Sequence, residues 1–264
     1  MIKSMIALAK MQFSQYNIYK SNFYLFTLNR IVEVIVYIFV WQAIYNQTGE
    51  LAGGFSINQM ITYYILSVTI SPLVHWGINE DIAYSIRNGQ INKELLNPIS
   101  YFKYYFGINL GEMGFALVVG IATFIICSIF WSVVFPSSLG RFMMFIVVIL
   151  LGIPITFFLQ MIVGITGFYT NSIWGMQILR KAVISIFAGM IAPITLFPNW
   201  FQKLANILPF KELIYTPINI WLGQVPINDI YFIIIKQVIW AIILYSIAKI
   251  FFNHAVKKVT INGG

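Results

Sequence analysis

Side chains that could do chemistry are few in this chain of 264 residues, of which only 9% are charged. Arg30 and Glu33 lie in one apolar run, and their spacing of one helical turn allows the side chains to pair. Glu112 lies in another, after the pattern Gly107-x-x-x-Gly111, which allows close helix approach. Ionisable residues at membrane depth are candidate functional residues. The alternatives are a structural Arg30–Glu33 ion pair near the inner interface, and for Glu112 a position facing a partner subunit, a polar cavity or that interface.

Motifs for catalysis or metal binding are absent from the sequence. There is no G-x-x-x-x-G-K-[ST] phosphate loop, no H-E-x-x-H and no G-x-S-x-G, so we expect no ATP binding by that loop and no hydrolase site of these kinds. We expect His75 to be a hydrogen-bonded interfacial residue, and the single cysteine, Cys127, to be a small buried apolar one. The chain is therefore expected to hold no catalytic residue, no metal and no cofactor of its own.

The composition is that of a membrane protein. Hydrophobic residues make up 59% of the chain and the mean hydropathy is +0.83, whereas about 25% of residues are charged in a typical soluble domain. The apolar runs are continuous and lack the period of two that a transmembrane barrel would show. We predict an all-α polytopic membrane protein that forms a single domain over residues 1–264. The net charge of +8 is read as a sign of orientation in the membrane and not of nucleic-acid binding.

Six apolar runs are each close to the roughly 20 residues that cross a bilayer as a helix. They are residues 24–45, 58–78, 104–131, 141–168, 175–193 and 230–252. With a cytoplasmic N-terminus, the inside segments hold eleven lysines and arginines and the outside segments four, with Arg30 counted apart. The positive-inside rule therefore predicts that both termini lie in the cytoplasm.

The first 20 residues have an amphipathic pattern. Ile2, Met5, Ile6, Ala9 and Phe13 follow helical spacing, and the two lysines of this segment lie away from that stripe. Such a pattern suits a helix that lies flat at the inner leaflet. The alternative is the frayed start of the first span.

The region 193–228 holds five of the nine prolines and several apolar pieces too short to cross a membrane. Helices that stop at proline and reverse would form a re-entrant or interfacial hairpin on the outer side. Trp200 and Trp221 suit the headgroup level. The alternative is a long outer loop, but the region is too apolar for a freely solvated one.

The charged insert 79–103, between two apolar runs, contains two predicted short helices. Glu80 and Asp81 open the first, where acids complement the positive helix end. Asn88 and Gly89 are a turn signal that ends it. The second helix covers about 92–96 and ends before the next proline.

Leu95 and Leu96, with Lys93 and Glu94 beside them, form an apolar anchor with charged flanks. A surface of this kind could insert into a groove on a soluble partner. The alternative is a solvated linker that only joins two spans, and the residues alone do not decide between the two.

The run from Ile86 to Ile99, IRNGQINKELLNPI, resembles the cytoplasmic element of ABC-2-type transporter permeases, which in one branch reads approximately I-R-x-G-x-(I/L)-x-x-x-L-(L/x)-x-P. The later pattern also resembles that branch. It comprises Pro193, Leu196, Phe197, Pro198, Leu208, Pro209, Phe210, Pro217 and Gly223. Both motifs lie in the family's order, so the resemblance covers essentially the whole chain. The chain departs from the family at Asn97, where arginine often precedes the proline, and this puts a charge contact there in doubt.

The resemblance implies the permease subunit of an ATP-binding cassette exporter. Two separate cytoplasmic subunits would bind ATP and Mg, and the permease would dimerise with itself or with a similar chain. Region 79–103 would be the coupling element, and the proline-rich hairpin would gate or cap a substrate route lined by spans one, two and five. The implied coupling residues are Arg87, Gly89, Lys93, Glu94, Leu95, Leu96 and Pro98. A hydrophobic or amphipathic substrate and the cytoplasmic membrane of a bacterium are typical of the family.

Two other classes remain as alternatives. A secondary transporter or channel would usually show inverted repeats or interrupted helices in matching halves, and this sequence is irregular only late, near 193–228. An intramembrane enzyme would need a cluster of acids, histidines or cysteines at one depth, and Glu33 and Glu112 alone are too sparse.

Overall fold

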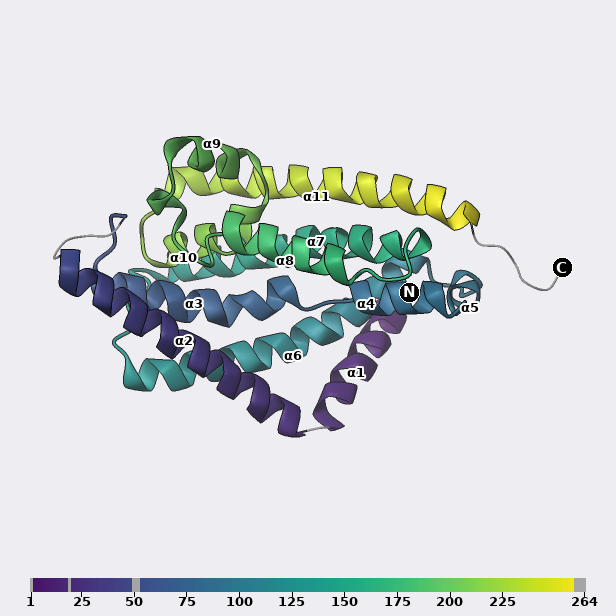
Figure 1. Ribbon diagram of the computed structural model, residues 1–264, viewed down its shortest axis with the longest axis horizontal. Helices are drawn as coiled ribbons and strands as arrows, with labels where there is room; N and C mark the ends of the chain where they lie inside the picture. The colour runs from purple at the N-terminus through teal and green to yellow at the C-terminus, as the bar shows by residue number, and fades with distance from the viewer. Residues whose placement is uncertain (1, 19, 49–52, 259–264) are drawn as a thin grey trace.

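The computed structural model describes residues 2–18, 20–48 and 53–258, and every regular element in these ranges is a helix (Figure 1). Five segments are long and apolar enough to cross a membrane. They are Ser21–Gln47, Ile57–Arg87, Tyr101–Phe130, Leu139–Phe168 and Ile227–Ala255. The fold class is therefore an all-helical membrane protein, as the composition predicts.

Long and short helices alternate along the chain. The longer ones are α1 (Ile2–Ile18), α2 (Lys20–Thr48), α3 (Ile57–His75), α6 (Tyr101–Phe130), α7 (Leu139–Ile165), α8 (Trp174–Phe187) and α11 (Ile227–Ala255). The shorter ones are α4 (Asn79–Arg87), α5 (Ile91–Leu95), η1 (Thr166–Phe168), η2 (Ile194–Leu196), α9 (Asn199–Ile207), η3 (Phe210–Leu213), α10 (Tyr215–Trp221) and η4 (Val256–Lys258). In Figure 1, α4, α5, the start of α1 and the end of α11 lie at one end of the molecule, and α9 and α10 lie toward the other. We call these the α4–α5 end and the α9–α10 end.

The predicted fifth span, 175–193, corresponds to a helix shorter than the five candidates. α8 has 14 residues and is therefore about 21 Å long, against a hydrocarbon core of about 30 Å. The chain continues beyond it: the Gly189 carbonyl accepts a hydrogen bond from Tyr63 at 2.6 Å, and the Ile191 carbonyl accepts one from Tyr64 at 2.7 Å. Segment 174–191 thus reaches the second turn of α3, although α8 alone is too short for a full crossing.

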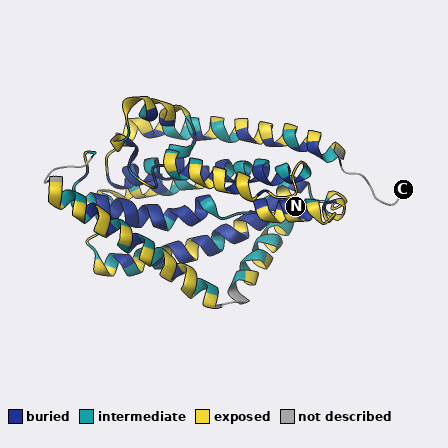
Figure 2. Ribbon diagram, in the orientation of Figure 1, coloured by how far each residue is buried: buried dark blue, intermediate teal, exposed yellow. Residues whose placement is uncertain are grey.

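α3 is the most deeply buried of the long helices (Figure 2). Almost all of its side chains from Met60 to Val74 are buried, as expected of a helix that is apolar on every side. α2 and α11 instead expose large apolar side chains such as Phe39 and Phe232, which are 66% and 73% exposed. Apolar faces of this extent suit lipid or another subunit.

α1 packs along a glycine-lined face of α6. A Cβ on Gly111 would lie 2.4 Å from the Ala9 carbonyl oxygen, and one on Gly107 would lie 3.1 Å from the Leu8 Cβ. The close helix approach that the Gly107-x-x-x-Gly111 spacing predicts is therefore confirmed. The position of α1 at a membrane surface stays a prediction.

Gly111→Ala is expected to push α1 away from α6, because the added methyl would meet backbone atoms of Ala9, which cannot rotate aside. We expect the free energy of unfolding to fall by about 2 kcal/mol. Thermal unfolding of the purified protein in detergent measures this. Gly140→Ala is the matched control, since its nearest neighbour, Ser138 Oγ, would lie at an ordinary 3.8 Å. Equal melting temperatures for the two variants would contradict the close contact.

Candidate functional site

α4 is fixed to the end of α7 by two glycine contacts. A Cβ on Gly164 would lie 2.7 Å from the Ile82 Cβ, and one on Gly167 would lie 3.1 Å from the Ala83 Cα. Ile82 and Ala83 are fully buried. These approaches leave no room for side chains, so α4 packs tightly against the end of α7 and against η1, which follows it.

α5 is attached to the first turns of α6. Ile91 is buried, and Glu94 accepts hydrogen bonds from the Tyr105 hydroxyl at 3.1 and 2.9 Å. Arg87 donates to the Asn171 carbonyl at 2.8 Å, which links the end of α4 to the loop before α8. Gly89 has φ of 69° and makes the left-handed turn between the two short helices, a conformation that glycine adopts without strain.

The opposite face of α5 is open. Leu96 is 86% exposed and Leu95 is 40% exposed. Lys93 and Pro98 are also exposed. The element therefore presents an apolar tip with charge beside it, on a base fixed to α6 and α7. Its role in coupling stays a prediction.

The break between α3 and α4 is held by a buried amide from α7. Gln160, fully buried, accepts from the Ile78 N–H at 3.1 Å and donates to the Trp76 carbonyl at 2.7 Å. Asn109 of α6 donates to the same Gln160 oxygen at 3.3 Å. Gly77 has φ of 152°, and a Cβ there would lie 1.7 Å from Gln160 Oε1. α7 thus satisfies backbone groups that the broken helix leaves unpaired, and α6 bonds the amide that does so.

Arg180 of α8 hydrogen-bonds the last carbonyl groups of α3. Its guanidinium donates to the carbonyls of Val74 at 3.2 Å and His75 at 3.0 Å, and the residue is only 7% exposed. A cation at the carbonyl end of a helix is favourable both as a hydrogen-bond donor and through the helix dipole. The break at residues 76–78 is therefore connected to α6, α7 and α8 at once.

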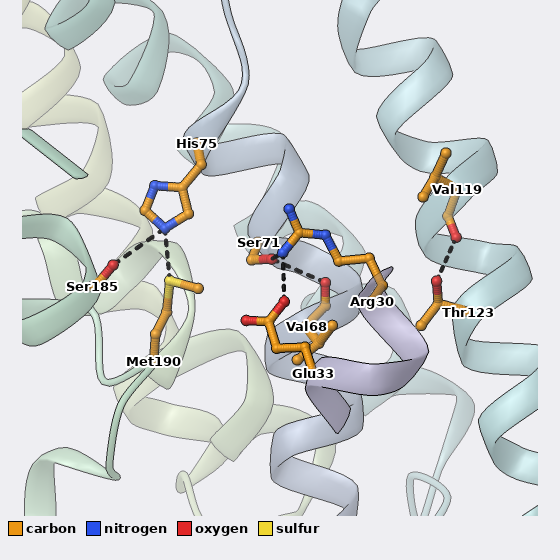
Figure 3. A network of polar contacts seen from close by, with 9 residues as sticks. All are labelled: Arg30, Glu33, Val68, Ser71, His75, Val119, Thr123, Ser185 and Met190. Atoms are coloured by element: carbon orange, nitrogen blue, oxygen red, sulfur yellow. Dashed lines mark hydrogen bonds and ion pairs between the residues drawn. The ribbon is translucent and has the colours of Figure 1, made fainter. Parts of the chain in front are cut away.

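Arg30 and Glu33 pair as their spacing predicts, with Arg30 Nη1 2.6 Å from Glu33 Oε2. Figure 3 shows that the pair faces α3, where Arg30 also donates to Ser71 Oγ at 3.4 Å. The Ser71 hydroxyl in turn donates to the Val68 carbonyl at 3.0 Å. Pro72 lacks the N–H that would bond this carbonyl within a helix, so the serine replaces the missing donor. The pair connects α2 to the proline site of α3.

His75 lies on the other side of α3, between α8 and the segment that follows α8 (Figure 3). Its Nε2 lies 2.9 Å from Met190 Sδ and 3.4 Å from Ser185 Oγ. These contacts fit the hydrogen-bonded residue that the sequence analysis expects. Cys127 is likewise fully buried among apolar side chains, as expected.

Glu112 is buried at the contact between α6 and α1, with 5% of its surface exposed. Gln12 and Tyr16 both donate to its Oε1 at 3.3 Å. Its second oxygen, Oε2, has no hydrogen-bond partner among the described residues. The sequence alone allows Glu112 to face a partner subunit, a polar cavity or the inner interface. In the structure, its Oε1 faces α1 of the same chain.

Region 193–228 is folded as short helical pieces at the α9–α10 end. Pro198 and Pro209 directly precede α9 and η3, where the missing N–H is not needed. Phe197 stacks on Phe201 at 4.5 Å between ring centroids. The remaining predicted hairpin residues are Pro193 and Pro217, which are buried, Phe210, which is half-buried, and Gly223, which ends α10 with φ of 78°. A re-entrant position in a membrane stays a prediction.

The headgroup position expected for Trp221 is wrong. Trp221 is 5% exposed, its ring lies 4.9 Å from that of Phe145, and its indole N–H donates to the Val134 carbonyl at 2.7 Å. It packs inside the protein because α10 lies against α7. Trp200 is 67% exposed and can still meet headgroups.

A partly buried ion pair joins the region 193–228 to α11. Lys236 lies 2.8 Å from Glu212, which is 1% exposed, and also donates to the Asn206 carbonyl at 2.5 Å. Gln237 donates to the Glu212 carbonyl at 3.2 Å. Nearby in η3, burial lowers the pKa of the Lys211 ammonium.

Several residues of the site are absent from the sequence-based candidates. They are Asn109, Gln160, Arg180, Glu212 and Lys236. Polar and charged residues inside apolar runs are a usable signal, and it would have found Asn109, Gln160, Arg180 and Lys236. Their partners, however, lie 24 to 106 positions away, and no pattern in the chain indicates them.

The comparisons with known proteins give one match. A family model described as "ABC-2 family transporter protein" matches residues 31–263, which include every long helix except α1 and the first part of α2. No curated protein matches the chain. The matched range includes residues 79–103 and 193–228. The chain therefore belongs to the ABC-2 family of transporter proteins and is a multi-pass membrane transport protein.

Proposed function

We propose that this chain is the membrane-spanning permease subunit of an ATP-driven exporter that moves a hydrophobic or amphipathic substrate. Two separate cytoplasmic subunits bind ATP and Mg and dock on α4 and α5. The permease pairs with a second copy of itself or a similar chain, within the lipid of a bacterial cytoplasmic membrane. Family membership supports the class of machine.

The observation that carries the proposal is the contrast between the two faces of α4 and α5. The outer face ends in the exposed Leu96, which suits a groove on a soluble partner. The inner face is fixed to α7 through Ile82 and Ala83 and continues into the break held by Gln160. A push on Leu96 would therefore reach the membrane helices directly, which is what a coupling element requires.

The proposed orientation puts the α4–α5 end in the cytoplasm, with both termini there. The excess of lysines and arginines in the inside segments supports it. It also requires an even number of crossings. We propose that α8 and the following residues to Ile191 form the sixth, because this segment reaches Tyr64 near the far end of α3. The segment 193–228 would then cap the outer side.

Leu96→Asp is expected to weaken binding of the ATP-binding subunit at least about tenfold, since it replaces an apolar anchor with a charge that must be desolvated. The measurement is co-purification and binding by surface plasmon resonance, with the permease in lipid nanodiscs and its ATP-binding partner subunit in solution. ATPase activity stimulated by the permease should fall in parallel.

Asn92→Asp is the matched control, because it adds the same charge to an exposed position on the same helix and leaves the leucine in place. We expect it to bind nearly as the native protein does. If Leu96→Asp binds and couples normally, α5 is not the docking face. If the native chain alone transports substrate on an ion gradient, the alternative of a secondary transporter replaces the proposal.

A further inference from the structure

A cavity of about 260 Å³ lies beside the break after α3. Its walls come from six helices and from the break itself: α1, α2, α3, α4, α6 and α8 all contribute residues. Three of these helices, α2, α3 and α8, belong to the spans that the family resemblance assigns to the substrate route. The cavity sits where a movement of α4 would change its shape, because Gly77 and Asp81 are both part of the wall.

One side of the cavity is aromatic. Tyr16, Phe26 and Trp76 line it, and they cluster around Phe115. Tyr16 stacks on Phe115 with 4.8 Å between ring centroids, Phe26 lies 4.9 Å from Trp76, and Trp76 stacks on Phe115 at 5.9 Å. The faces of such rings attract cations as well as apolar groups.

The other side is acidic. Glu80, Asp81 and Glu112 line the cavity, and Lys181 is the only lysine or arginine among its described lining residues. Glu80, Asp81 and Lys181 are exposed, so solvent weakens their charges. Glu112 is different, because it is 95% buried and no lysine or arginine of the described part pairs with it.

Glu112 lines this cavity and keeps one carboxyl oxygen without a hydrogen-bond partner among the described residues. Gln12 and Tyr16 occupy Oε1, whereas Oε2 is buried without a partner among the described residues. A buried carboxylate without a cation is costly. A cation in the cavity would stabilise the charged form of Glu112, whereas an anion would enter a cavity lined by three carboxyl groups.

We infer that this cavity is a binding site for a cationic aromatic or amphipathic amine, with the cation beside Glu112 and the apolar body against Tyr16, Phe26 and Trp76. The inference rests on the proposed export function, in that it names the class of substrate. An alternative role for Glu112, as an acceptor that only holds α1 on α6, requires its Oε1 alone and predicts no preference for cations.

The test is isothermal titration calorimetry of benzyltrimethylammonium into the permease alone, in nanodiscs of zwitterionic phosphatidylcholine. Phenylmethanesulfonate, an anion with the same aromatic group, is the control ligand. We expect the cation to bind the native protein and the anion to bind at least about tenfold more weakly.

Glu112→Gln is expected to weaken cation binding about tenfold, because it removes the charge and keeps an oxygen acceptor for Gln12 and Tyr16. Asp81→Asn, at the exposed edge, should weaken it about threefold. Asp229→Asn, which removes an exposed charge from α11, should leave binding unchanged. Melting temperatures of all variants check folding.

Equal binding of cation and anion, or unchanged cation binding in both Glu112→Gln and Asp81→Asn, would overturn the inference. The assay contains no ATP-binding subunit, so its failure leaves the docking result of Leu96→Asp untouched. Conversely, a permease that binds the cation but never binds an ATPase would retain this site and lose the proposed export function.

Discussion

Gly77→Ala is expected to lower the free energy of unfolding by roughly 3 kcal/mol or more and to abolish ATP-driven transport. The new Cβ would lie 1.7 Å from Gln160 Oε1, so Gln160 must leave its place. Its departure would leave the Ile78 N–H and the Trp76 carbonyl without partners, at about 1–3 kcal/mol each. Thermal unfolding in detergent measures the stability, and substrate efflux from cells measures transport.

Variants of two other glycines separate the collision of the added Cβ from the general effects of replacing glycine by alanine. Gly89→Ala has the strain of a positive φ, 69°, but an open surrounding, so it should cost about 1–2 kcal/mol. Gly175→Ala has open space and no positive φ, so it should be neutral. If Gly77→Ala and Gly175→Ala have the same melting temperature, the stability of the break after α3 does not depend on Gln160.

Lys236→Met is expected to cost about 3–5 kcal/mol, because it leaves the Glu212 carboxylate buried without its cation. Region 193–228 would then lose part of its attachment to α11, and the carbonyl of Asn206 would lose its donor. Limited proteolysis of this region and the melting temperature in detergent are the measurements.

Lys236→Met combined with Glu212→Gln should recover more than half of the lost stability, because the double variant has no unpaired buried charge. Lys203→Met, at an exposed position of α9, is the control for loss of a lysine and should be near neutral. If Lys236→Met is as stable as Lys203→Met, the Lys236–Glu212 pair does not hold region 193–228 on α11.

Local patterns predict the parts of this fold that depend on neighbours in sequence. Arg30 and Glu33 are one helical turn apart, and their pairing follows from helix geometry. The turn at Gly89 follows from the tolerance of glycine for positive φ. Glycine spacing on α6 likewise predicts a close helix contact, although it does not identify α1 as the partner.

Tertiary contacts decide what these patterns leave open. Tryptophan is a residue type that is enriched at membrane interfaces, yet α10 packs the ring of Trp221 against Phe145. The apolar run 175–193 is long enough for a span, yet its helix ends at Phe187 and the chain continues in irregular form past Gly189. Composition reports the preference of a segment for an apolar environment, whereas contacts across the bundle determine where a helix stops.

The break after α3 also has a consequence for biosynthesis. Its backbone groups at residues 74–78 are satisfied by Gln160 and Arg180, which the ribosome adds more than 80 residues later. A nascent chain that has just inserted α3 and α6 contains the broken helix end without these partners, in a setting where unpaired backbone groups are costly. The α3–α4 junction must therefore acquire its final geometry only after α7 and α8 have been synthesised, late in the synthesis of the chain.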